Sequence, residues 1–267
     1  MQRGSENDIK RPAAWLQNGF HRFLGPFLKR HFHAIAVETT SREDRSLPAD
    51  APLVVYANHP SWWDPLIAHF LNRTLFPSRQ FYAPIDAEAL QQYRVFERLG
   101  FFGVQLDNRA GAAAFLSQSR SILSQSETAL WITPEGRFAD IRDHDAAFQP
   151  GLAHLCSKSD SLVALPVALE YVFWEERLPV CLVAIGQAQI TADAPDRSKA
   201  DWTCCLTRAL RDAQNRLAER SVSRDSTCFE NLLQGKRGGG GMYDSFRRLK
   251  ALMTGRSFKA AHGEHFE

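Results

Sequence analysis

The hydrophobic pattern begins with an apolar stripe near the N-terminus. Its spacings place six residues on one helical face, namely Leu16, Phe20, Phe23, Leu24, Phe27 and Leu28. The stripe predicts an amphipathic helix, kinked at Gly25-Pro26 because proline cannot donate the helical backbone hydrogen bond.

From residue 52 onward, short apolar runs alternate with segments of helical periodicity. The runs predict buried strands at 52–57, 101–106, 129–133, 162–171 and 178–185. Helical periodicity is found at 65–71, 110–123, 152–157 and 202–220. This alternation predicts an α/β fold with a central, mostly parallel or mixed sheet covered by helices, and it leaves the strand order open.

Charge changes the interpretation of the N-terminal helix. Between Lys10 and His33 there is no acidic residue, while Trp15 joins the phenylalanines and the charged residues are Lys10, Arg11, Arg22, Lys29 and Arg30. Basic and aromatic residues on an amphipathic helix are typical of the membrane interface. A helix packed on its own domain shows the same stripe. We expect residues 1–35 to contact a membrane, with ordinary packing as the alternative.

The C-terminal segment differs from the rest of the chain. Four consecutive glycines at 238–241 predict a flexible hinge. They do not form a phosphate-binding loop, because no Gly-Lys-Ser or Gly-Lys-Thr follows them. A basic and apolar stretch comes next, around Phe246, Leu249, Leu252 and Met253. We expect a catalytic domain at 36–222 and a Gly-rich basic tail at 223–267, either disordered or serving as a second membrane anchor.

Composition narrows the class of protein. The 267 residues suffice for one α/β domain, and a formal net charge of +2 gives no overall field for nucleic acid. The five cysteines form no Cys-x-x-Cys pair, which favours reduced thiols in the cytoplasm. We find neither a signal-peptide pattern nor an uncharged apolar run of about 18 residues. These features predict a peripheral or monotopic protein at the cytoplasmic face of a membrane.

Residues 58–64, Asn-His-Pro-Ser-Trp-Trp-Asp, combine an imidazole and a carboxylate at the end of a predicted strand. His59 and Asp64 meet only if the segment turns, which Pro60 and Pro65 favour. We expect Asp64 to cap the next helix, with Pro65 in its first position, and to bend back toward His59. A carboxylate on one imidazole nitrogen fixes the tautomer and leaves the other nitrogen to take a proton. The segment therefore predicts a general base for a hydroxyl group.

Three other interpretations of this segment are a helix cap without a catalytic role, a serine nucleophile and a zinc site. An aspartate that caps a helix needs no catalytic explanation. A serine nucleophile is disfavoured, because the chain has no Gly-x-Ser-x-Gly and Ser61 lies between the base and its partner. Zinc is disfavoured by the lack of His-Glu-x-x-His and of a cysteine cluster. We expect neither a metal nor a cofactor.

Three further turns complete a recognisable series. They are Gly-Val-Gln-Leu-Asp-Asn-Arg at 103–109, Thr-Pro-Glu-Gly-Arg at 133–137 and Leu-Pro-Val at 165–167. Together with 58–64 they resemble the lysophosphatidic acid and glycerol-3-phosphate acyltransferase family. Its pattern is Asn-His-x4-Asp, Gly-x3-Ile-x-Arg, Phe-Pro-Glu-Gly-Thr-Arg and an apolar-Pro-apolar block. The resemblance covers roughly residues 53–185.

The resemblance implies roles for the charged residues of these blocks. His59 would deprotonate the acceptor hydroxyl, and Asp64 would orient His59. Arg109 would contact the anionic head group of the acceptor, with Arg137 as a second ligand. A guanidinium suits phosphate because it donates two parallel hydrogen bonds. The alternative for each arginine is a surface ion pair.

The remaining matched residues would line the substrate pocket. Glu135 and Gly136 would shape the acceptor site, and Pro166 would support the wall near the acyl thioester. Asn58 and Gly103 belong to the same blocks and join the predicted substrate-binding residues.

The implied reaction is direct transfer of a fatty acyl group to a lysophospholipid such as 1-acylglycerol-3-phosphate, in phospholipid biosynthesis. Acyl-CoA or an acyl carrier protein would be the donor, and a membrane surface and the lipid acceptor the other partners. Two departures bear on the acceptor: no residue separates Gly136 from Arg137, and Leu106 and Asp107 replace an aromatic and an aliphatic residue. A glycolipid, a carotenoid glycoside or an amino-acid lipid is therefore an alternative acceptor. A catalytically silent lipid-binding scaffold is the alternative from another class.

Overall fold

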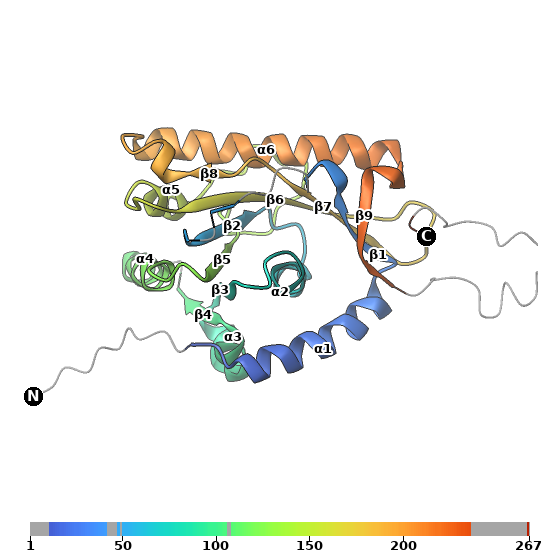
Figure 1. Ribbon diagram of the computed structural model, residues 1–267, viewed down its shortest axis with the longest axis horizontal. Coiled ribbons are helices and arrows are strands. Elements are labelled where there is room, and N and C mark those ends of the chain that lie inside the picture. Colours follow the sequence, from blue (N-terminus) through green and yellow to red (C-terminus); the bar gives the residue numbers. More distant parts are fainter. Residues whose placement is uncertain (1–10, 42–46, 49, 106–107, 236–265, 267) are drawn as a thin grey trace, which may run out of the picture.

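The protein is built in three layers (Figure 1). The computed structural model describes residues 11–41, 47–48, 50–105, 108–235 and 266. Helix α6 (Lys199–Ser223) runs along one face of a central sheet, while α1 (Ala14–His31) and α2 (Asp64–Leu75) cover the other. The predicted α/β architecture and N-terminal helix are confirmed. The predicted glycine hinge, the apolar stretch after it, and Leu106 and Asp107 lie outside the described residues.

The described residues form a nine-stranded mixed sheet in the order β4-β3-β5-β2-β6-β7-β1-β9, with β8 paired to β6. The strands are β1 (Ala34–Glu38), β2 (Leu53–Ala57), β3 (Gln80–Asp86), β4 (Phe101–Val104), β5 (Thr128–Ile132), β6 (Val163–Val172), β7 (Val180–Ile185), β8 (Gln189–Ile190) and β9 (Phe229–Gln234). Neighbours from β4 to β6 pair in parallel, whereas β7 is antiparallel to β6 and β9 to β1. The carboxyl ends of five parallel strands therefore meet at one edge.

Helices cover both faces because successive residues of each strand point to opposite sides. Val54 and Tyr56 of β2 face α4, α5 and α6, whereas Val55 faces α1 and α2. The remaining α-helices are α3 (Ala87–Gln92), α4 (Arg109–Leu123) and α5 (Gly151–Cys156). Short 3-10 helices lie at Thr39–Ser41, Arg94–Leu99, Thr191–Asp193 and Ser226–Cys228.

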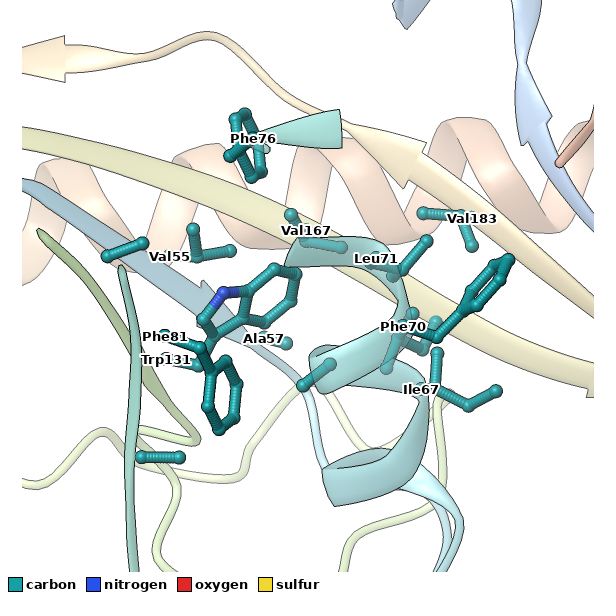
Figure 2. Packing of buried hydrophobic residues seen from close by; sticks show 14 of the residues in the cluster. Val55, Ala57, Ile67, Phe70, Leu71, Phe76, Phe81, Trp131, Val167 and Val183 are labelled. Atoms are coloured by element: carbon teal, nitrogen blue, oxygen red, sulfur yellow. The ribbon is translucent and has the colours of Figure 1, made fainter. Parts of the chain in front are cut away.

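Helix α2 is fixed to the sheet by its apolar side (Figure 2). Ile67 and Leu71 are fully buried in one cluster with Val55 and Val167. Burial of a large aliphatic side chain stabilises the fold by about 1.5–3 kcal/mol. These contacts hold the whole helix in place, including Asp64 at its first turn.

The predicted apolar stripe of α1 packs mostly on the protein itself. Leu24 and Leu28 have no exposed surface, and Phe20 and Phe27 are partly buried against the same core. Phe23 is different, with 60% of its surface exposed. The helix is continuous from Ala14 to His31 with Pro26 inside it. Most of the stripe is thus explained by ordinary packing, and only its outer aromatic residues remain exposed.

None of the helices within the described ranges is long and apolar enough to cross a membrane.

Four strands, β1, β3, β8 and β9, have no counterpart among the predicted elements. β1 and β9 pair with each other along the edge of the sheet, and β3 lies between β4 and β5. β9 begins at Phe229, so the sheet extends past the expected boundary at residue 222. Its sequence, Phe-Glu-Asn-Leu-Leu-Gln, has weak alternation, and pairing with β1 places it in the sheet.

Candidate active site

Three of the parallel strands end in residues that the sequence marked as candidates. β2 leads directly to Asn58 and His59, β4 is followed by Arg109 at the start of α4, and β5 leads to Glu135. Ligands of open α/β sheets bind at the edge formed by the carboxyl ends of the strands. The parallel topology thus gathers segments that are far apart in the sequence.

His59 and Asp64 form a hydrogen-bonded pair at the end of β2. The ring Nδ1 lies 2.6 Å from Asp64 Oδ2, and the two side chains are 19% and 5% exposed, respectively. Because an ionised carboxylate only accepts hydrogen bonds, Nδ1 carries the proton and Nε2 has a lone pair. The contact between these residues that the sequence predicted is present.

Asp64 does not cap its helix as predicted. It is the first residue of α2, Trp63 occupies the cap position, and the cap makes no side-chain hydrogen bond. The Asp64 carboxylate instead turns back and accepts a hydrogen bond from the backbone N–H of Ser61, at 3.0 Å. Pairing with His59 has taken the place of capping.

An aromatic ring covers one side of the imidazole. The ring centroids of Phe138 and His59 are 4.2 Å apart, with an interplanar angle of 32°. The backbone N–H of Ala139 also donates to the His59 carbonyl, at 3.0 Å. Phe138 itself is 58% exposed. The loop after β5 is thereby attached to the turn that carries His59.

Asn58 braces the turn from inside the protein. It is 1% exposed, its Nδ2 donates to the Leu169 carbonyl at 2.9 Å, and its Oδ1 accepts from the Leu169 N–H at 2.8 Å. The amide thus engages the backbone of β6 on both its oxygen and its nitrogen. This geometry gives Asn58 a structural role, and its predicted contact with substrate stays a prediction.

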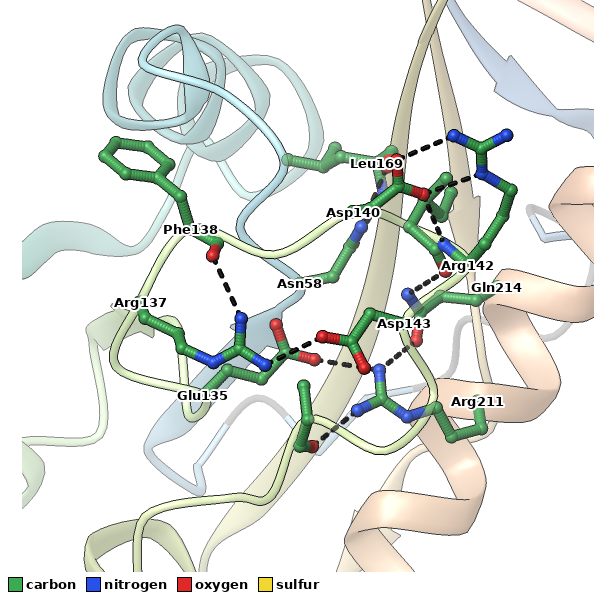
Figure 3. A network of polar contacts seen from close by, with 12 residues as sticks. Asn58, Glu135, Arg137, Phe138, Asp140, Arg142, Asp143, Leu169, Arg211 and Gln214 are labelled. Carbon is green, nitrogen blue, oxygen red and sulfur yellow. Dashed lines mark hydrogen bonds and ion pairs between the residues drawn. The ribbon is translucent and has the colours of Figure 1, made fainter.

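Glu135 belongs to a buried polar network centred on Arg211 (Figure 3). Its Oε1 lies 2.8 Å from Nη1 of Arg211 on α6, and the two side chains are 1% and 9% exposed, respectively. Arg211 also donates to the carbonyl of Ala146 and to the side chain of Gln214, each at 2.7 Å. Gln214 in turn donates to the carbonyl of Ile141. Glu135 therefore holds the 134–149 loop on α6, and its side chain points into this network.

The loop turns sharply at Gly136 and then exposes Arg137. Gly136 has φ +66°, a conformation that other residues adopt rarely, and an added Cβ would lie 3.2 Å from Gln149. Arg137 forms an ion pair with Asp143 at 2.7 Å (Figure 3), and its side chain is 56% exposed. The alternative of a surface ion pair is thus realised for Arg137 in this structure.

Arg109 begins α4 with an exposed side chain. The Asn108 side chain caps this helix by accepting from the Gly111 N–H at 2.7 Å. Two strands lie between β4 and β2 in the sheet, so the two strands are roughly 14 Å apart. Arg109 therefore lies at the same edge of the sheet as His59 but does not contact it directly, and its predicted contact with the acceptor stays a prediction.

Comparison with known proteins agrees with this geometry. Residues 38–170 match the model of the Acyltransferase family. The chain belongs to the acyltransferase family. The match includes both members of the His59–Asp64 pair, together with Arg109 and Glu135. No curated protein shows significant similarity to the chain.

Two predicted pocket residues of this acyltransferase have structural explanations. An added Cβ at Gly103 would lie 3.2 Å from the Cα of Ala87, so glycine lets α3 approach β4. Pro166 is buried within β6, between the residues that pair with β8 and those that pair with β7. Proline lacks an N–H, and at this junction its carbonyl still accepts from Gly186, at 2.9 Å. The predicted substrate contacts of Gly103 and Pro166 remain predictions.

No sequence pattern indicated three other residues near the His59–Asp64 pair and Glu135. Tyr171 contacts Asp64 across 107 positions, and Arg211 contacts Glu135 across 76. Phe138 directly follows a motif residue, but nothing in its neighbourhood indicated contact with His59. Among the described residues, no group of three or more His, Cys, Asp or Glu side chains is arranged to hold a metal ion.

Proposed function

We propose that this acyltransferase moves a fatty acyl group from acyl-CoA or an acyl carrier protein to a hydroxyl of a lysophospholipid such as 1-acylglycerol-3-phosphate. The reaction would serve phospholipid biosynthesis. The observation that carries the proposal is the bond between His59 Nδ1 and Asp64 Oδ2. It leaves Nε2 as a base at the same sheet edge that carries the exposed Arg109.

The proposed reaction needs no covalent enzyme intermediate. His59 Nε2 takes the proton of the acceptor hydroxyl while the oxygen attacks the thioester carbonyl carbon. Asp64 stabilises the imidazolium that forms. The tetrahedral intermediate then collapses, the C–S bond breaks, and the leaving thiolate takes the proton from His59. The products are an ester and a free thiol.

Base catalysis supplies only part of the rate enhancement. It contributes typically about 10²- to 10⁴-fold, and holding two substrates in the right orientation supplies much of the remainder. The buried Glu135–Arg211 pair supports this second task, because it fixes the loop that places Phe138 on His59.

An anionic head group suits the surroundings of Arg109. Its exposed guanidinium has the geometry to bind phosphate through two hydrogen bonds. The ion pair between Arg137 and Asp143 favours the alternative that the acceptor is a glycolipid, a carotenoid glycoside or an amino-acid lipid. Arg137, the second arginine that would bind a phosphate, is already paired with the Asp143 carboxylate.

We place the reaction at the cytoplasmic face of a membrane, with the protein bound peripherally. Trp15, Phe23 and Trp62 are 70%, 60% and 69% exposed, respectively. Ring contacts run from Phe23 through Phe27 and Trp63 to Trp62, with centroid distances of 5.5, 6.0 and 5.7 Å. Exposed aromatic side chains are favoured at membrane interfaces. This row of rings supports lipid contact next to the catalytic turn, and Arg22, Lys29 and Arg30 add exposed positive charge.

An acceptor panel tests the proposed function. The full-length protein is given radiolabelled acyl-CoA or acyl carrier protein with 1-acylglycerol-3-phosphate, a neutral lysolipid, a glycolipid or an amino-acid lipid. We expect ester formation to be fastest with the phosphate-bearing acceptor, because Arg109 would bind its head group. His59→Ala is the control, since it keeps the surface and removes the base.

Two other outcomes of the acceptor panel would contradict the proposed function. Transfer only to an acceptor without phosphate would replace the lysophospholipid with the alternative class. Binding of lipids without turnover of any donor would favour the silent scaffold and overturn the proposed function.

A further inference from the structure

The two carboxylate oxygens of Asp64 have different hydrogen-bond partners. Oδ2 accepts from His59 at 2.6 Å and from the Ser61 N–H at 3.0 Å. Oδ1 accepts from the hydroxyl of Tyr171 at 2.5 Å. Asp64 is only 4% exposed, so protein groups replace most of the water that a free carboxylate would bind.

We propose that Tyr171 is a positioning residue of the active site. Its hydroxyl fixes the plane of the Asp64 carboxylate so that Oδ2 faces His59 Nδ1. The effect of Tyr171 on catalysis rests on the proposed function. Its effect on the orientation of Asp64 does not depend on that function. Without this donor, Oδ1 would be a buried acceptor lacking a protein partner, and the carboxylate would be freer to rotate.

The sheet places the tyrosine rigidly. Tyr171 lies near the end of β6, in register with Cys181 of β7, and its ring centroid is 5.9 Å from that of Phe32. Burial raises the pKa of Tyr171 well above its ordinary value, and the neighbouring Cys181 and Asp64 raise it further. The phenol therefore stays protonated and donates a hydrogen bond to the Asp64 carboxylate.

The same stretch of β6 holds both ends of the catalytic turn. Leu169 bonds the Asn58 amide next to His59, and two residues later Tyr171 bonds Asp64. β6 thus braces the imidazole side and the carboxylate side of the pair from one rigid strand. This arrangement also explains why Asn58 is buried and turned away from solvent.

The variant Tyr171→Phe tests the proposal because it removes only the hydroxyl. We expect kcat to fall roughly 10- to 100-fold, as for loss of a hydrogen bond to a charged group, while both KM values change little. Tyr56→Phe is the matched control. Tyr56 is fully buried in the sheet, and its hydroxyl donates at 3.2 Å to the Leu206 carbonyl on the α6 side. Its loss should leave kcat near that of the wild type.

A second measurement uses no substrate. In proton NMR, the His59 Nδ1 proton should give a downfield signal that exchanges slowly with water in the wild type and in Tyr56→Phe, and His59→Ala identifies it. In Tyr171→Phe the signal should broaden or disappear. An unchanged signal together with unchanged kcat would overturn the proposal. Equal losses in both phenylalanine variants would also overturn it, because Tyr171 would then be only a packing residue.

Failure of the proposed function gives a different result. A wild type that transfers no acyl group to any acceptor would remove the function, while the NMR comparison would still decide whether Tyr171 positions Asp64.

Discussion

Glu135 and Arg211 lie 76 positions apart in the sequence and form a buried ion pair 2.8 Å long. Glu135 follows β5, whereas Arg211 is in the middle of α6. The pair joins the loop carrying Phe138 to the longest helix within the described ranges, so a residue of α6 holds the loop that contacts His59.

Removal of Arg211 should therefore destabilise the protein strongly. Arg211→Ala leaves the Glu135 carboxylate buried without its partner, which costs about 3–5 kcal/mol in comparable pairs. Urea unfolding followed by circular dichroism measures this loss. The control is Arg142→Ala, which removes the exposed ion pair with Asp140 and should leave the midpoint unchanged. Equal midpoints for the two variants would show that the buried pair does not stabilise the loop.

Loss of His59 or Asp64 should reduce transfer severely without unfolding the protein. His59→Ala removes the base, and Asp64→Asn replaces an acceptor with an amide that cannot stabilise imidazolium. We expect activity to fall by about 10²- to 10⁴-fold in each case. Acyl-transfer assays and circular dichroism on one preparation measure both effects. Activity retained in His59→Ala would exclude this histidine from the mechanism.

Arg109 should contribute to acceptor binding more than to donor binding. Arg109→Ala removes a charge-assisted hydrogen bond worth about 1.5–3 kcal/mol. The acceptor KM should therefore rise roughly 10- to 100-fold, and the donor KM should change little. Arg137→Ala is the comparison, and its effect should be smaller because Asp143 already pairs with Arg137. Initial rates with each substrate varied in turn give these constants, and equal changes in both KM values would contradict the assignment.

Variants at two neighbouring residues of α1 distinguish contact with lipid from packing within the protein. Phe23 is 60% exposed, whereas Leu24 is fully buried. Phe23→Ser should weaken sedimentation with anionic liposomes and leave the melting temperature unchanged. Leu24→Ala should lower the free energy of unfolding by about 2–5 kcal/mol, as for other buried leucines. Added salt should release part of the wild type, because Lys and Arg near an anionic surface contribute about 1 kcal/mol each. Sedimentation that is unchanged in Phe23→Ser would argue against lipid contact by α1.

His69 should make the protein less stable in mild acid. Burial lowers the pKa of His69 to about 4, and the positive charges of His21 and Arg73 add to the effect. Between this value and the ordinary 6.5, the unfolded chain binds the proton more tightly than the folded protein does. Stability from this group is therefore full at neutral pH and falls as the pH drops from about 6.5 toward 4, by about 3 kcal/mol in all.

Urea unfolding at several pH values tests this expectation. Comparison of the wild type with His69→Phe isolates the contribution of His69 from the carboxylates that titrate in the same range. A parallel pH dependence in the two proteins would contradict the prediction.

The sequence alone determined the α/β class and the contact between His59 and Asp64, because both depend on local patterns. Apolar runs of strand length define β2, β5 and β6, and Pro60 and Pro65 favour the turn in which His59 meets Asp64. The four motif blocks also indicated the family.

Only the tertiary structure decided which residues support the pair and which motif residues face inward. Tyr171, Arg211 and Leu169 come from strands and helices far along the chain, and their contacts depend on strand order, which hydrophobic periodicity does not encode. The amphipathic pattern of α1 likewise could not distinguish protein from lipid as the partner of its apolar face, because both bury apolar surface and only packing against α2 and the sheet separates Leu24 from Phe23.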